Sequence, residues 1–107
     1  MKERLVRNLE LPKVLDSGKV YTCGKLQDDS EFLDVVDEQL AQTLNEYTNM
    51  KSGSNSVKID KIAEIIELSY LLAEIMGYTH CDIEELIDKK VVEDGGFSKR
   101  FYIEEAE

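Results

Sequence analysis

The fold follows from one stretch near the middle of the chain, residues 57–76, which reads VKIDKIAEIIELSYLLAEIM. This stretch predicts a helix whose apolar residues cover well over half of its circumference. A helix with so wide an apolar surface must be buried on more than one side. The chain has 107 residues and few other elements that could cover this helix, so we expect a second subunit to complete the burial.

Another amphipathic helix is predicted before this one, over about residues 30–50. Asp29 or Ser30 supplies its N-cap. Apolar residues recur every three or four positions along one face of it, which is the helical spacing: Phe32, Val36, Leu40, Leu44 and Tyr47. The polar loop at 51–56 is typical of a connection between antiparallel helices.

A third helix is predicted to begin near Asp82, which resembles the first residue of a capping box with Glu85. Gly77 separates it from the central helix, and Gly95-Gly96 ends it. The three helices and their short connections predict an antiparallel arrangement.

The whole chain, residues 1–107, is thus predicted to be one all-α domain, an antiparallel helical bundle completed by oligomerisation. Residues 1–30 form a lead-in segment and residues 95–107 a tail. We expect the partner to be a second copy of the chain, in a homodimer or homotetramer.

The chain is acidic, with 13 Lys and Arg against 23 Asp and Glu and a net charge of −10. This charge repels the phosphate backbone and anionic lipids, which argues against DNA, RNA and membranes as partners. No apolar run approaches the roughly 18 residues needed to cross a bilayer, and the charged N-terminus does not read as a secretory signal. Cys23 and Cys81 lack zinc-site spacing and are taken as free thiols, so we expect a cytoplasmic protein.

A row of carboxylates on the central helix is the first candidate for chemistry. Asp60, Glu64, Glu67 and Glu74 share one face, with Lys61 beside them. A divalent cation such as Mg²⁺ would relieve the repulsion within this row. The alternative is a solvated face of an acidic protein.

Residues outside the central helix add to the candidates. Glu46, near the end of the preceding helix, either faces the row across the short loop or belongs to a polar face. Lys99 and Arg100 follow two glycines and either meet a triphosphate or pair with a neighbouring carboxylate. His80 has no nucleophile placed beside it by the sequence and is expected in a surface turn.

Several segments, in this order along the chain, carry a family resemblance. They include RLVRN at 4–8, IAEIIE at 62–67, LLAEIMG at 71–77 and GGFSKR at 95–100. On these motifs the chain resembles the all-alpha nucleoside-triphosphate pyrophosphohydrolase superfamily, the MazG-like group that includes phosphoribosyl-ATP pyrophosphohydrolase. The resemblance implies an all-alpha oligomer and Mg²⁺-dependent hydrolysis of a nucleoside triphosphate to the monophosphate and pyrophosphate.

The acids of the family's metal motifs are partly replaced here. The family places its ligands in an ExxE pattern on one helix and an ExxD pattern on the next. The best register puts the first pattern on Thr43 and Glu46 and the second on Lys61 and Glu64. One acid of each pair is therefore absent, and Asn8 stands where the opening motif has an Asp.

The resemblance still implies a metal and substrate site from the residues that remain. The Mg²⁺ ligands it leaves are Glu46, Glu64 and, one turn on, Glu67, and the substrate-binding residues are Lys61, Lys99 and Arg100. Two functions stay open: a working pyrophosphohydrolase, or a catalytically inactive oligomer that binds a nucleotide or another protein. Convergence of Glu46 and Glu64 makes a metal site feasible, whereas an ion pair between Lys61 and Glu46 favours the inactive oligomer.

Overall fold

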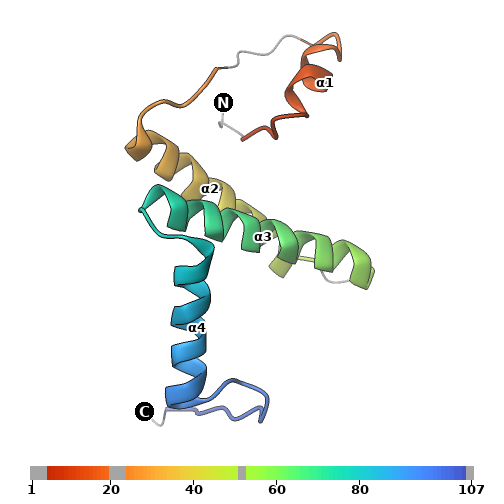
Figure 1. Ribbon diagram of the computed structural model, residues 1–107. Coiled ribbons are helices and arrows are strands. Elements are labelled where there is room, and N and C mark those ends of the chain that lie inside the picture. Colours follow the sequence, from red (N-terminus) through yellow and green to blue (C-terminus); the bar gives the residue numbers. More distant parts are fainter. Residues whose placement is uncertain (1–4, 20–23, 51–52, 106–107) are drawn as a thin grey trace.

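The computed structural model describes residues 5–19, 24–50 and 53–105. These residues form four helices and no strand: α1 (Leu11–Leu15), α2 (Asp29–Thr48), α3 (Asn55–Ile75) and α4 (His80–Asp94) (Figure 1). The all-helical prediction is confirmed. In the described part of the chain, no helix combines the length and apolar character required to cross a bilayer.

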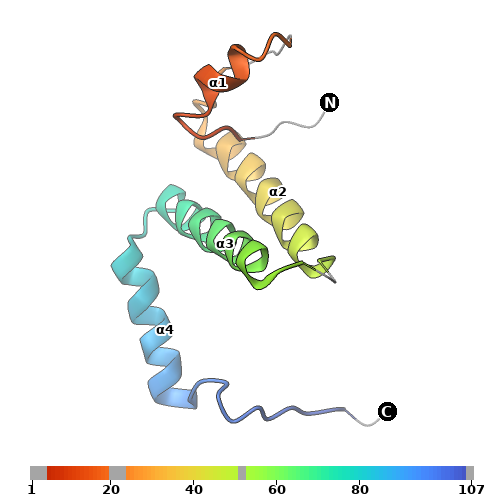
Figure 2. The same cartoon turned by 90° about the vertical axis from the view of Figure 1, so that its right-hand side faces the viewer.

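The helices α2 and α3 form an antiparallel hairpin, and the two views agree on this arrangement (Figures 1 and 2). Helix α2 begins one residue earlier than the sequence predicts, because the Asp28 carboxylate accepts the backbone N–H of Ser30 at 3.1 Å. The buried side chains of the described residues all lie in this hairpin: Val35, Val36, Thr43 and Ala73. The hairpin is thus the only part of the described chain with the beginnings of a core.

A tight turn joins α3 to α4. Gly77 has a φ of 94°, and its N–H bonds to the Glu74 carbonyl at 3.0 Å while that of Tyr78 bonds to the Ala73 carbonyl at 2.9 Å. This pair of hydrogen bonds is a Schellman motif, and its left-handed residue is the glycine that the sequence places there. Gly77 therefore ends α3 as predicted.

The start of α4 differs from the prediction. Thr79, not Asp82, is the N-cap: its hydroxyl accepts the Asp82 N–H at 3.2 Å, and the Asp82 carboxylate accepts the Thr79 N–H at 2.8 Å. Asp82 is thus the third helical residue of the capping box. As a consequence, His80 is the first residue of α4 and does not lie in a surface turn.

Helix α4 and the tail extend away from the hairpin. Helix α4 contacts only α3 among the helices and points away from it, and residues 95–105 follow as an exposed, non-helical tail (Figure 2). Cys81, near the start of α4, is an exposed free thiol. Two residues singled out from the sequence, Cys23 and Arg4 of the opening motif, lie outside the described residues.

The chain is less compact than a typical folded domain of the same length. Its radius of gyration is 17.9 Å, against about 13 Å for a compact domain of this size. Its accessible surface is 9744 Å², against about 6,000 Å² for a folded monomer of the same mass. One chain therefore leaves exposed much of the apolar surface that a compact domain would bury.

Candidate functional site

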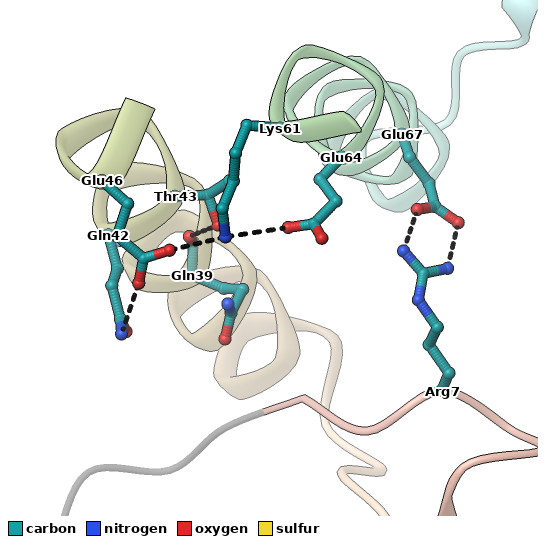
Figure 3. A network of polar contacts seen from close by, with 8 residues as sticks. All are labelled: Arg7, Gln39, Gln42, Thr43, Glu46, Lys61, Glu64 and Glu67. Atoms are coloured by element: carbon teal, nitrogen blue, oxygen red, sulfur yellow. Dashed lines mark hydrogen bonds and ion pairs between the residues drawn. The ribbon is translucent and has the colours of Figure 1, made fainter. Parts of the chain in front are cut away.

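Three charged side chains from two helices meet on one side of the hairpin (Figure 3). Glu46 lies near the end of α2, and Lys61 and Glu64 lie one turn apart on α3. The Lys61 Nζ is 2.7 Å from the Glu46 Oε2 and 3.8 Å from the Glu64 Oε2. From the sequence, Glu46 can face the carboxylates of the central helix across the short loop. The structure shows this for one of those carboxylates, Glu64.

Their mutual contact favours the charged forms of Glu46 and Lys61. The hydrogen bond from Lys61 is the main cause that lowers the pKa of Glu46 below its ordinary value, and the Gln42 amide adds to it from 3.3 Å. The pKa of Lys61 is raised, first by the Glu46 hydrogen bond and further by the charges of Glu64 and Asp60, against the opposing effect of burial. The Lys61 side chain is only 26% exposed, so this ammonium is more sheltered than an ordinary surface lysine.

Thr43 stands where the family resemblance expects an acid. Its side chain is buried, with 1% exposure, and its hydroxyl donates to the Gln39 carbonyl at 2.8 Å. The hydroxyl proton is therefore donated within α2, to a carbonyl one turn earlier in the same helix. The position lies beside the cluster of Glu46 and Lys61 (Figure 3).

Glu67, the third predicted metal ligand, binds a different cation. The Arg7 guanidinium donates two hydrogen bonds to its carboxylate, at 2.9 and 2.7 Å. These bonds lower the pKa of Glu67 and raise that of Arg7. Figure 3 shows Glu67 directed toward the lead-in segment and away from Lys61. In the sequence, Arg7 stands out only as part of the opening motif, and no sequence pattern predicts its contact with Glu67.

The predicted magnesium ligands thus separate into two groups. Glu46 and Glu64 converge on Lys61, and Glu67 pairs with Arg7. Among the described residues no group of three or more His, Cys, Asp or Glu side chains is placed to hold a metal ion. Since Mg²⁺ needs several oxygen ligands at about 2.0–2.1 Å, an ion at Glu46 and Glu64 would have to displace the Lys61 ammonium. The arrangement therefore does not fit a magnesium ion as it stands.

The predicted substrate-binding residues also lie apart. Lys61 is on the hairpin, whereas Lys99 and Arg100 are in the tail beyond α4. Helix α4 has 15 residues, which corresponds to a length of about 22 Å. The tail lies at the end of α4 remote from α3 (Figure 1). One chain therefore does not gather these three cations around a single phosphate group.

No family model, curated protein or solved structure matches this chain. The MazG-like resemblance stays a prediction that stands on the motifs quoted above.

Proposed function

We propose that this chain is a non-hydrolysing helical protein whose function is association with a second copy of itself. The observation that carries the proposal is the position of Lys61, whose ammonium lies between the two carboxylates that converge across the hairpin. This is the ion pair that favours the inactive oligomer over the working enzyme. The charge that a metal would supply at this point is supplied by the chain.

A resident cation changes what the site can do. An ammonium neutralises one carboxylate charge and donates hydrogen bonds, but it has no exchangeable water to offer as a nucleophile and no open coordination position for a phosphate oxygen. Arg7 has the same neutralising effect at Glu67. Both ion pairs are satisfied within one chain.

The exposed apolar surface supports self-association. Helix α3 is apolar on most of its circumference, yet Ala73 is its only buried residue, and Ile59 and Ile66 are at least half exposed. Helix α4 has no buried residue at all. Large exposed apolar patches mark surfaces that are covered by a partner. A second copy supplies apolar surface of the same kind, as the sequence predicts.

The proposal is tested by mass and by chemistry on the same preparation. Sedimentation equilibrium is expected to give a dimer or tetramer, and incubation with a panel of nucleoside triphosphates and Mg²⁺ or Mn²⁺ is expected to release no pyrophosphate above background. A monomer at high concentration would overturn self-association. Release that disappears in both Glu46→Ala and Glu64→Ala would overturn the non-hydrolysing function.

The second candidate is the Mg²⁺-dependent nucleoside-triphosphate pyrophosphohydrolase. One observation favours it: Glu46 and Glu64 come from different helices and still converge on one cation. The double variant Thr43→Glu with Lys61→Glu restores the acids that the family motif expects. If only this variant binds Mg²⁺ and releases pyrophosphate, the chain has lost an activity whose framework it keeps. If the unmodified chain does both, it is an enzyme and Lys61 yields to the metal.

A further inference from the structure

An apolar groove runs along the face of α3 near its junction with α4. It is wide open to solvent, with a volume of about 580 Å³, and its apolar lining includes Ala63, Ile66, Tyr70 and Leu71. His80, the first residue of α4, closes one end by stacking on the Tyr70 ring with the ring centres 4.0 Å apart. Nothing in the described residues fills this groove.

The tail carries exposed apolar side chains of the kind that such a groove can accept. Phe97, Phe101, Tyr102 and Ile103 are each more than four-fifths exposed. Water-exposed aromatic side chains in this number are costly, because each buries 150–250 Å² when it is packed. Lys99 and Arg100 lie among them.

We infer that residues 97–103 of one chain dock in the α3 groove of a second copy, and that the second copy returns the same contact. The inference rests on the proposed self-association and names the surfaces that carry it. The exchange gives a two-fold symmetric dimer in which each chain offers one tail and one groove. A closed arrangement of this kind uses the same patch on both subunits.

The lengths favour a second copy over the chain's own groove. Seven extended residues span about 23 Å, and the groove from Ala63 to Glu74 is about 16 Å long. A tail from a neighbouring molecule can therefore lie along the whole groove. Only Gly95 and Gly96 separate Phe97 from the far end of α4, which lies about 22 Å from His80, so residues 97–103 cannot lie along the groove of their own chain.

The charges are complementary. Two carboxylates line the groove, Glu67 and Glu74. Glu67 is already held by Arg7, whereas the side chain beside the Glu74 carboxylate is the His80 imidazole at 3.6 Å. Lys99 and Arg100 of an incoming tail would bring two positive charges to Glu74 at the edge of an apolar groove. In a chain of net charge −10, this contact also offsets the repulsion between two copies.

The experiment uses charge exchange in the full chain. One variant carries Lys99→Glu with Arg100→Glu, and the other carries Glu74→Lys. Each is measured alone and in an equimolar mixture by sedimentation equilibrium. Each variant alone is expected to raise the dimer dissociation constant by about tenfold or more, because every tail then meets a like charge. The mixture is expected to form a heterodimer of near wild-type affinity, because every tail again meets an opposite charge.

A matched control separates a local contact from net charge. The variant Lys89→Glu with Lys90→Glu changes the charge by the same amount on α4, outside the tail. When it is mixed with Glu74→Lys, no heterodimer of near wild-type affinity is expected. Another variant, Phe101→Ser with Tyr102→Ser, tests the apolar part of the contact and is also expected to weaken the dimer. A wild-type chain that is monomeric overturns the proposed function itself. A wild-type dimer whose affinity none of these changes alters, or that shows no rescue on mixing, overturns only the tail exchange.

Discussion

Replacing Lys61 by Gln removes the cation between two carboxylates and leaves the fold of α3 otherwise unchanged. The Glu46 and Glu64 oxygens are 2.7 and 3.8 Å from the Nζ, so they lie within the sum of these two distances of each other. Without the ammonium, the two negative charges face each other across the hairpin. We expect Lys61→Gln to destabilise the chain and at the same time to create affinity for a divalent cation.

The magnitude follows from the geometry. The lost ion pair with Glu46, whose side chain is 43% exposed, contributes about 0.5–1 kcal/mol, as partly exposed pairs do. Two like charges about 6 Å apart repel by about 1 kcal/mol at an effective dielectric constant between those of water and the protein surface. The total of about 1–2 kcal/mol corresponds to a fall in the melting temperature of about 5–15 °C for a domain of this size.

The assay is thermal unfolding at fixed protein concentration, with and without Mg²⁺. Ligand that binds only the folded state raises the melting temperature by linkage. Lys61→Gln is expected to recover part of its loss when Mg²⁺ is added, while the unmodified chain and the control Lys58→Gln, one turn away on α3, respond little. An equal response of the unmodified chain and Lys61→Gln would refute the view that Lys61 occupies the place of a metal.

Three further predictions follow from the contacts described. Arg7→Ala and Glu67→Gln are each expected to lower the free energy of unfolding by less than about 1 kcal/mol, because the pair is exposed. The double variant is expected to lose no more than either single variant, because both remove the same bidentate contact. Chemical denaturation in a double-mutant cycle measures this coupling. The lowered pKa values of Glu46 and Glu67 mean that folding favours the charged carboxylates. Their stabilisation is therefore present above pH 4.5, the ordinary pKa of Glu, and is lost as the pH falls through the lowered values. A plot of melting temperature against pH is expected to show this loss, and Arg7→Ala is expected to make it smaller. Thr79→Ala is expected to cost about 1 kcal/mol because α4 loses its capping box, and the loss of helical circular dichroism at low temperature would locate the effect; an unchanged stability contradicts the role of the cap.

Much of the helical order was predictable because it depends on local signals. Apolar spacing located α2 and α3, and the short loop between them left open whether Glu46 faces α3 or belongs to a polar face. Gly77 marks the end of α3 because its left-handed conformation is one that glycine adopts easily. The start of α4 was placed too late because Asp82 fits a capping box as either member, and only the structure shows that Thr79 is the cap.

Other features depend on contacts that the sequence does not encode locally. The ion pair of Arg7 with Glu67 joins residues 60 positions apart, and no periodicity links a short lead-in segment to one turn of a helix. Apolar residues recur at helical spacing along α4 and predict a buried face, yet three of them are about half exposed: Leu86, Ile87 and Val91. A pattern shows that a face requires a partner, but it does not say whether the partner lies in the same chain.

The hairpin of α2 and α3 also has a consequence for how the chain reaches its final state. Its two helices are neighbours in the sequence, joined by residues 49–54, and they hold all the buried side chains of the described residues. Such pairing has low contact order and forms within microseconds to milliseconds without any help. Under the proposed tail exchange, helix α4 and the tail gain burial when a second copy arrives, and the last step of folding is then expected to be second order in protein. Refolding then has a fast phase that dilution leaves unchanged and a slow phase that dilution lengthens in proportion.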